Sequence, residues 1–165
     1  MKIFKSFKYA IKGIIYTLKN ERNMRFHTFA SVCVLVLSPF FNLSLEKYII
    51  LFLTITLVVA FEMINSSVES LVDVCSKDYN STAKAAKDIA AGAVLITSLL
   101  ALVIGIMMFH DVKCYIKLWE FLYVNPFSFV VLSIFAVFGY LYIFWGPTEI
   151  KNRTKKFKNN IKAKK

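Results

Sequence analysis

Hydrophobic positions along the 165-residue chain fall into four long runs that are separated by short polar segments. The runs cover residues 26–41, 48–68, 89–109 and 121–145. A helix needs roughly 17 to 25 apolar residues to cross a bilayer. The first run is close to the lower limit, so its flanking residues must contribute to the span. The pattern therefore predicts an all-α integral membrane fold with four transmembrane helices.

The polar segments between the runs predict the connections. A break at 78–81 divides the mixed segment 70–88, which separates the second run from the third. Residues 110–120 are expected to form a loop before the fourth run. Gly146-Pro147 is expected to end that run, because proline cannot continue a helix.

Residues 3–19 show the pattern of an amphipathic helix. Their large apolar side chains share one helical arc of about 100°, and lysines flank it. Such a helix lies on a membrane surface, with its apolar face in the interface and its lysines reaching towards the headgroups. The same pattern also suits a plain basic anchor that takes no part in a site.

The charge of the chain is unevenly distributed. The net charge is +11, with seven of the 21 basic residues in 1–25 and eight in 151–165. Neither basic segment contains a recognisable base-reading module, and both adjoin apolar runs. We therefore expect anionic lipid headgroups, and not nucleic acid, as partners of these segments.

The same charges predict the topology. Placing both termini and the 70–88 connection on the cytoplasmic side leaves only Lys47, Lys113 and Lys117 on the other side. This arrangement satisfies the positive-inside rule. We expect a multi-pass protein with both termini in the cytoplasm.

A polar stripe interrupts the second run. At about 100° per residue, positions 62, 65, 69 and 73 share an arc of about 80° on one helix, occupied by Glu, Asn, Glu and Asp. An ionisable side chain inside a span is costly unless a partner compensates it, so the stripe is a candidate functional site. Alternatively, Glu62 and Asn65 form a buried polar pair that fixes helix packing or oligomeric state.

The predicted topology gathers charged residues at the cytoplasmic interface: Glu21, Glu69, Asp73, Lys87 and Asp88. Mg²⁺ usually takes one or two carboxylates and fills its shell with water and phosphate oxygens. Glu21 and Glu69 suit that role if their helix ends converge, and Lys87 offers a charge to phosphates. Glu62, placed deeper, suits a general base for a lipid hydroxyl. The chain lacks the phosphate-loop pattern G-x-x-x-x-G-K-S/T, so any nucleotide site must be built from helix side chains.

Three sequence blocks occur in order within residues 1–110. Residues 62–73 carry the pattern E-x-x-N-x-x-x-E-x-x-x-D, and residues 86–95 read AKDIAAGAVL. At the N-terminus, SFKYAIKG at 6–13 is followed by ERNMRFH at 21–27. These blocks resemble the small prokaryotic diacylglycerol kinase family. The N-terminal block resembles its Gram-positive branch, whose members are undecaprenol kinases.

The resemblance implies a homotrimeric membrane lipid kinase that uses ATP and Mg²⁺, with active sites shared between neighbouring subunits. It implies catalytic roles for Glu62, as the proton acceptor, and for Asn65, with Asp73 in support. It implies that Glu21 and Glu69 hold the metal. The implied ATP contacts are Lys2, Tyr9, Glu21, Glu69, Asp78, Lys87 and Asp88. The residues implied to border the lipid site are Lys12, Asn23 and Arg25.

The N-terminal block favours undecaprenol as the substrate, giving undecaprenyl phosphate, over diacylglycerol, which would give phosphatidic acid. The fourth run and the polybasic tail have no counterpart in the family, and Asn80 stands where many members have His. A non-enzymatic membrane scaffold with a lipid-binding tail is the alternative from another class. A small solute carrier is less favoured, because the sequence shows no inverted repeat.

The expected organisation has four parts in the plasma membrane of a bacterium. They are the surface helix and hinge 1–25, the three-span kinase core 26–110, the outer loop and fourth span 111–146, and the cytoplasmic tail 147–165.

Overall fold

The computed structural model describes residues 2–75 and 80–163, and these residues are almost entirely helical. The elements are α1 (Lys2–Asn20), α2 (Arg22–Leu37), the 3₁₀-helix η1 (Ser38–Phe41), α3 (Leu45–Cys75), α4 (Ser81–Met108), α5 (Val112–Val124) and α6 (Pro126–Ala163). Four segments are long and apolar enough to cross a membrane: Arg22–Phe41, Leu45–Cys75, Ser81–Met108 and Phe127–Gly146. The expectation of an all-α chain with four candidate spans is confirmed.

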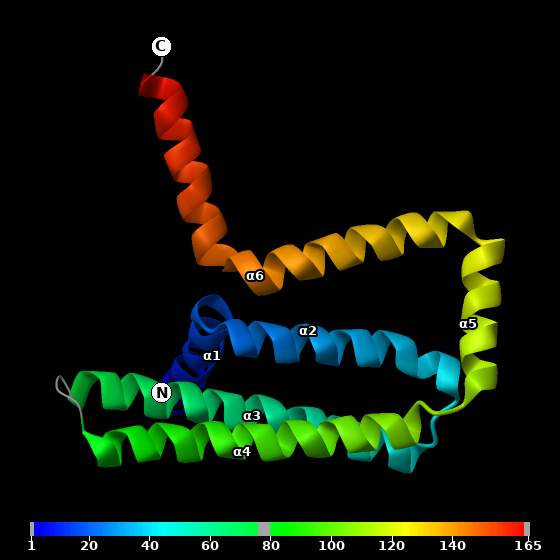
Figure 1. Ribbon diagram of the computed structural model, residues 1–165, viewed down its shortest axis with the longest axis horizontal. Helices are drawn as coiled ribbons and strands as arrows, with labels where there is room; N and C mark the ends of the chain where they lie inside the picture. The colour runs from blue at the N-terminus through cyan, green and yellow to red at the C-terminus, as the bar shows by residue number, and fades with distance from the viewer. Residues whose placement is uncertain (1, 76–79, 164–165) are drawn as a thin grey trace.

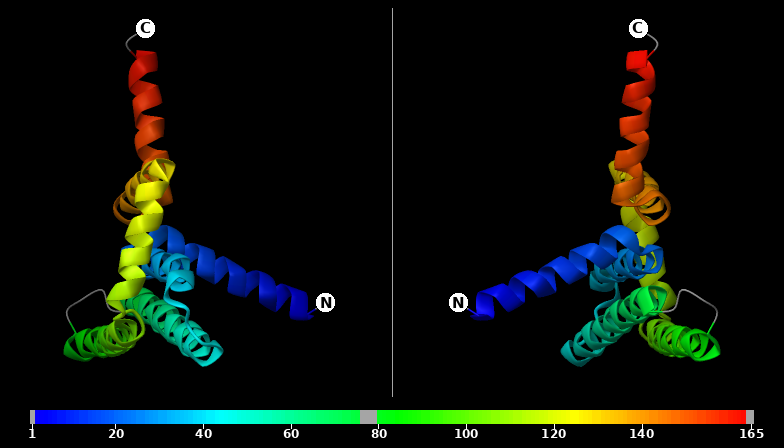
Figure 2. Two further views of the ribbon diagram at one scale, coloured as in Figure 1. Left: turned by 90° about the vertical axis from the view of Figure 1, so that its right-hand side faces the viewer. Right: turned by 90° about the vertical axis from the view of Figure 1, so that its left-hand side faces the viewer.

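The four candidate spans lie side by side (Figure 1). Helix α3 packs chiefly against α4, while α2 contacts α3 and also α6. Helix α1 leaves the bundle at its junction with α2 and runs across the direction of the spans (Figure 2). Helix α1 also contacts α3. The junction of α1 and α2, where Glu21 lies, therefore sits close to the polar residues of α3.

The predicted loop at 110–120 is wrong for most of its length, because residues from 112 onward belong to the helix α5. Asp111 caps it, with a carboxylate oxygen accepting a hydrogen bond from the Lys113 amide at 2.9 Å. The helix crosses the end of the bundle opposite the α1–α2 junction (Figure 1). Tyr115 packs edge-on against Phe41, with ring centroids 5.0 Å apart. The fourth span begins at Phe127 and not at 121, because the chain breaks at Asn125 between α5 and α6.

The connection between α3 and α4 is shorter than the polar segment 70–88 suggests. Helix α3 continues without a break to Cys75, and α4 begins at Ser81. The Asn80 side chain caps α4, accepting hydrogen bonds from the amides of Thr82 at 2.9 Å and Ala83 at 3.2 Å. Asn80 thus starts a helix in this chain. The other predicted turn residues, 78 and 79, lie outside the described residues.

The predicted end of the fourth span at Gly146-Pro147 is confirmed as a sharp change of direction. Gly146 has φ 54° and ψ 156°, which interrupts the helical backbone of α6. Beyond it the chain resumes a helical course to Ala163 and points away from the spans (Figure 1).

Few side chains are buried within the single chain. The most hydrophobic stretch of α4 has no buried residue, and large apolar side chains such as Leu99, Leu102 and Ile106 are exposed there. Among the residues whose side chains the structure describes, the buried apolar ones are Met24, Phe41, Leu51, Val58, Met108, Cys114 and Ile143. Lipid or partner helices must cover the remaining apolar surface, because water does not solvate so large an apolar area favourably.

Candidate functional site

The buried face of α3 changes from apolar to polar halfway along the helix. Leu51, Thr54 and Val58 lie on this face in the first half, and the helical spacing continues to Glu62 and Asn65. The exposed fraction is 2% for Glu62 and 6% for Asn65. Two polar side chains therefore occupy positions that would ordinarily hold core leucines or valines.

The hydrogen bonds of this face leave two buried oxygens without partners. Asn65 donates from Nδ2 to Glu69 Oε1 at 2.9 Å, and Ser66 donates from Oγ to the Glu62 carbonyl at 3.1 Å. Glu62 Oε2 and Asn65 Oδ1 are buried with no hydrogen-bond partner among the described residues. Buried polar atoms without partners are rare, and leaving one unsatisfied costs about 1–3 kcal/mol. The pair is therefore poorly explained as packing alone.

Two more carboxylates gather near Glu62. Glu69 and Glu21 both interact with it electrostatically. Glu21 precedes α2 in an extended conformation, with φ −97° and ψ 120°, and its side chain makes no capping hydrogen bond. Like charges this close repel one another, so a bound cation would stabilise the group.

The carboxylates Glu21 and Glu69 fit the donor set of a divalent metal. Mg²⁺ prefers oxygen ligands, and it completes its shell with water and phosphate oxygens when a protein supplies one or two carboxylates. In the described part of the chain, no group of three or more His, Cys, Asp or Glu residues is arranged to hold a metal by itself. A metal held by these two carboxylates would take its remaining ligands from water or from a bound molecule.

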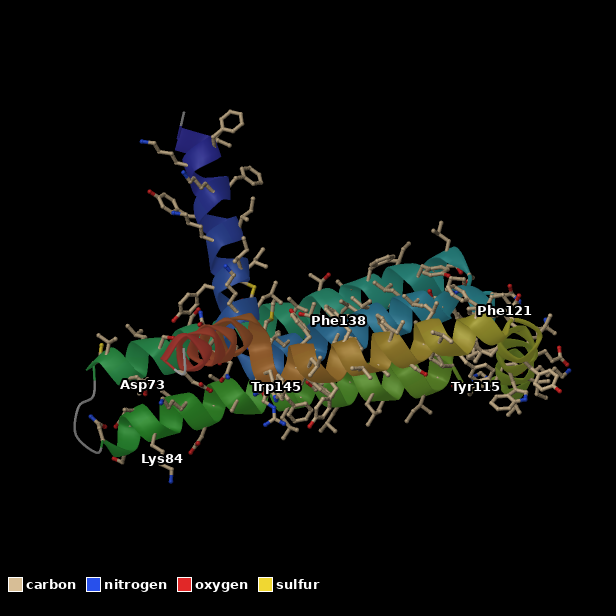
Figure 3. The ribbon with its side chains drawn as sticks, turned by 90° about the horizontal axis from the view of Figure 1, so that it is seen from above. Asp73, Lys84, Tyr115, Phe121, Phe138 and Trp145 are labelled. Atoms are coloured by element: carbon tan, nitrogen blue, oxygen red, sulfur yellow. The ribbon has the colours of Figure 1, made fainter. Side chains whose placement is uncertain are left out.

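The outer end of the polar stripe is exposed and ion-paired. Lys87 Nζ on α4 forms a salt bridge with Asp73 Oδ1 on α3, with side chains 35% and 68% exposed. Figure 3 shows Asp73 and Lys84 at the same end of the α3–α4 pair, far from Tyr115 and Phe121 on α5. Asp88, next to Lys87, is also exposed. Depth along α3 thus separates a buried carboxylate from an exposed ion pair.

Other predicted site residues lie on α1, away from this stripe. Tyr9 is 67% exposed, and Lys12 Nζ lies 5.9 Å from the centre of its ring. Lys2 begins α1, and the helix points away from the spans (Figure 2). Asn23 is exposed in the first turn of α2. Asp78 lies outside the described residues.

Arg25, predicted to border the lipid site, is 6% exposed and contacts the fourth span. Its Nε donates to the Ile143 carbonyl at 3.2 Å, and its Nη1 donates to the Lys19 carbonyl at 3.1 Å. Sequence reasoning missed this role, and it also missed the buried Ser66. The signal for Ser66 was its place about 40° from Glu62 around the helix.

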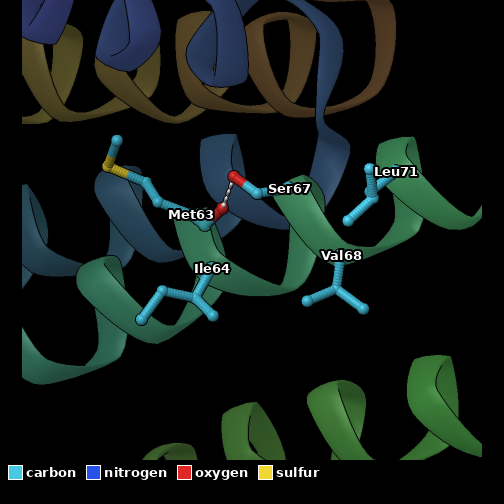
Figure 4. A pocket seen from close by; sticks show the side chains of 5 residues that line it. All are labelled: Met63, Ile64, Ser67, Val68 and Leu71. Atoms are coloured by element: carbon cyan, nitrogen blue, oxygen red, sulfur yellow. Dashed lines mark hydrogen bonds between the residues drawn. The ribbon is translucent and has the colours of Figure 1, made fainter.

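The opposite side of α3 offers an apolar surface at the same depth. A shallow hollow of about 360 Å³ is lined by Met63, Ile64, Ser67, Val68 and Leu71 (Figure 4). The Ser67 hydroxyl donates to the Met63 carbonyl at 2.9 Å, which satisfies its polar group within the helix. The segment that carries the carboxylates on one side therefore presents an apolar surface on the other.

Comparison with known proteins covers the first two thirds of the chain. A family model described as prokaryotic diacylglycerol kinase matches residues 8–109. An undecaprenol kinase from Bacillus subtilis (strain 168) is 38% identical over 108 residues, which cover 66% of this chain and 88% of that protein. A diacylglycerol kinase from Synechocystis is 40% identical over 101 residues, covering 61% of this chain and 58% of that protein. A diacylglycerol kinase from Escherichia coli (strain K12) is 28% identical over 102 residues, covering 62% and 84%.

Proposed function

This chain belongs to the prokaryotic diacylglycerol kinase family and is a lipid kinase, and we propose that its substrate is undecaprenol, which it converts to undecaprenyl phosphate with ATP. The similarity to an undecaprenol kinase over 88% of that protein's length supports this substrate. Diacylglycerol is the second candidate, because the similar protein from Synechocystis is named a diacylglycerol kinase. Membership in a family of lipid kinases speaks against the non-enzymatic scaffold.

The observation that carries the proposal is the buried, unpartnered carboxylate oxygen of Glu62. Glu62 accepts the proton of the lipid hydroxyl while the oxygen of this hydroxyl attacks the γ-phosphorus of ATP. The bond between this phosphorus and the bridging oxygen breaks, and ADP leaves with the bond's electron pair. A positioned general base typically contributes about 10²- to 10⁴-fold to a rate. The amide of Asn65, hydrogen-bonded to Glu69, holds the metal-binding carboxylate beside this base.

Glu21 and Glu69 would hold Mg²⁺ in this proposal. When bound, the ion neutralises the charge on the phosphate oxygens. Two observations support this assignment. Both carboxylates interact electrostatically with Glu62, and the Glu21 side chain makes no capping hydrogen bond to α2. Asp73 supports the site by holding Lys87 in an ion pair.

Nucleotide binding is assigned to residues at the exposed end of the stripe and on α1, together with Asp78, which lies outside the described residues. Lys87 and Asp88 contact ATP from α4, and Lys2, Tyr9 and Asp78 complete the contacts. Helix α1 points away from its own α3, which supports a homotrimer in which α1 of one subunit reaches the site of its neighbour (Figure 2). The large apolar side chains that α4 exposes, such as Leu99, Leu102 and Ile106, support the same assembly.

The lipid substrate enters from the bilayer, bordered by Lys12, Asn23 and Arg25. Helix α1 lies on the membrane surface, and its lysines contact anionic headgroups. Both termini face the cytoplasm in the plasma membrane of a bacterium. The course of α1 across the direction of the spans supports this placement, as do the basic residues near both termini.

The substrate is tested by measuring phosphate transfer from labelled ATP in mixed micelles that contain either undecaprenol or diacylglycerol. We expect faster transfer to undecaprenol and no transfer without Mg²⁺. Faster transfer to diacylglycerol would reverse the substrate assignment. Negligible transfer to both lipids would contradict the proposed phosphorylation of either alcohol.

A further inference from the structure

Residues 110–165 lie outside the match to the family, yet the fourth span contacts the metal-binding end of the kinase core. Arg25 and Arg22, which follow Glu21, both contact residues at the end of this span. Accepting the proposed role of Glu21, we infer that α6 is a brace that positions Glu21 through Arg25, so that metal binding in this chain depends on its fourth span.

The fourth span contains a backbone acceptor, the Ile143 carbonyl, that has no helical donor. In a helix, the carbonyl of Ile143 would accept a hydrogen bond from the amide of residue 147, which here is a proline without an N–H. The Arg25 guanidinium takes that place, donating from Nε to the Ile143 carbonyl at 3.2 Å. A buried carbonyl without a donor would be costly, so the interruption at Pro147 creates a binding point for a cationic donor.

Gly146 makes room for the same side chain. A Cβ atom at this position would lie 2.9 Å from Arg25 Cζ and 3.0 Å from its Nη1, closer than unstrained contacts allow. The backbone of Gly146 also has φ +54°, a conformation that residues with a side chain rarely adopt. Gly146 therefore leaves space for the Arg25 side chain, and Pro147 leaves the Ile143 carbonyl open to accept its hydrogen bond.

The other end of Arg25 reaches α1. Its Nη1 donates to the Lys19 carbonyl at 3.1 Å, in the last turn of α1, where carbonyls have no donor within the helix. One side chain thus ties the end of α1, the start of α2 and the end of the fourth span together. Glu21 lies between Lys19 and Arg25 in the chain, so these bonds restrict the backbone on both sides of it.

Two further contacts dock α6 onto this junction. The Arg22 guanidinium lies over the Phe144 ring, 4.5 Å from its centre, and such a contact is attractive. Deeper in the spans, Phe29 stacks on Phe135 with ring centroids 5.0 Å apart. Gly139 faces Phe29 so closely that a Cβ there would lie 2.0 Å from the ring. Helices α2 and α6 therefore pack against each other along the span, and the Arg25 hydrogen bond is one of several contacts between them.

The test uses the full-length protein with Gly146→Ala and Pro147→Ala combined, which fills the space beside Arg25 and gives the Ile143 carbonyl an amide donor. Hydrogen–deuterium exchange of residues 17–25 should become about fivefold faster, the change expected for losing one hydrogen bond. The Mn²⁺ concentration for half-saturation, titrated by electron paramagnetic resonance with ATP present, should rise about tenfold, as when a residue that orients a metal ligand is lost.

Gly105→Ala is the matched control, because a Cβ there meets no atom within 4 Å. It should change neither measurement. A folded double variant with unchanged exchange at 17–25, or with faster exchange but unchanged Mn²⁺ binding, would overturn the brace.

If the double variant does not fold, the same two measurements are made on Phe144→Leu. This substitution removes the aromatic ring beneath Arg22 and keeps an apolar side chain at that position. Faster exchange and weaker Mn²⁺ binding would support the brace, and wild-type values would overturn it. Wild-type protein that transferred no phosphate to either lipid would contradict the proposed function, while exchange and Mn²⁺ binding would still decide the role of α6.

Discussion

The polar face of α3 carries a buried cluster (Glu62, Asn65 and Ser66) and, two to three turns further on, Asp73, which forms an exposed ion pair with Lys87 of α4. The buried cluster contains two oxygens without hydrogen-bond partners among the described residues. In the exposed pair, each charge meets an opposite one, and water reaches both side chains. The two groups therefore differ in their free-energy cost to the folded chain, although both consist of polar side chains.

The difference in cost indicates what each group contributes. A buried oxygen without a partner destabilises the folded chain, so selection for stability alone would not retain Glu62 and Asn65. An exposed ion pair contributes about 0–1 kcal/mol, so Asp73 and Lys87 contribute little to stability either. Reaction chemistry is expected at the buried cluster and binding of a charged substrate at the exposed pair.

The largest effect is expected for Glu62→Gln, which keeps the size of the side chain and removes the proton acceptor. The turnover rate should fall by about a thousandfold, within the range that a general base contributes. The thermal unfolding midpoint should stay the same or rise, because a buried charge is removed. Phosphate transfer and unfolding are measured on the same preparation.

The matched control for this variant is Glu46→Gln, which alters an exposed carboxylate in the first turn of the same helix. Its turnover should equal that of the wild type. If Glu62→Gln kept the wild-type rate, Glu62 would have no part in the reaction, and the buried cluster would be a packing feature after all.

The next largest effect is expected for Glu69→Gln and for Glu21→Gln. Each should raise the Mg²⁺ concentration for half-maximal rate by about 10- to 100-fold, as losses around metal sites do, and leave the KM for lipid nearly unchanged. Glutamine at 69 can still accept the hydrogen bond from Asn65, so a change would reflect the lost charge. Unchanged Mg²⁺ dependence in both variants would place the metal elsewhere.

The sequence placed Glu62 and Asn65 of the buried cluster on one helical face, because this inference rests on local periodicity, but it missed Ser66. The apolar runs gave the four spans, and the helical spacing placed Glu62 and Asn65 on the buried face of α3. Both inferences need only a helix and a bilayer as physical assumptions. The grouping of Glu21 with Glu62 needed the topology as well, and the structure brings these two side chains close enough to interact.

What the sequence did not predict depends on tertiary contacts. Helix α5 was taken for a loop, because lysines interrupt its apolar residues and a short amphipathic helix across the end of a bundle lacks the signal of a span. The bond between Arg25 and Ile143 joins residues 118 positions apart, and no local pattern reports such a distance. The one local indication of this bond is Pro147, because a proline at this position leaves the Ile143 carbonyl without its helical donor.

A smaller effect is expected for Asn65→Ala, which removes the donor to Glu69 and leaves the Glu69 carboxylate in place. The Mg²⁺ concentration for half-maximal rate should rise about tenfold, the lower end of the range for a residue that orients a ligand. The unfolding midpoint should change little, because the unpartnered oxygen is lost together with the hydrogen bond. A loss of turnover as large as that of Glu62→Gln would instead mean that Asn65 contacts the reacting groups.

The smallest effect is expected for Asp73→Asn, at the exposed end of the polar stripe on α3. Stability should fall by about 0–1 kcal/mol, and less at high salt, because exposed ion pairs are weak and screened. The KM for ATP should change by about twofold, since Lys87 keeps its charge and loses only the partner that orients it. Lys87→Met removes the charge itself and should raise that KM further. If Asp73→Asn reduced turnover as strongly as Glu62→Gln, the two ends of the stripe would act as one catalytic unit, and depth along α3 would not separate lipid chemistry from nucleotide binding.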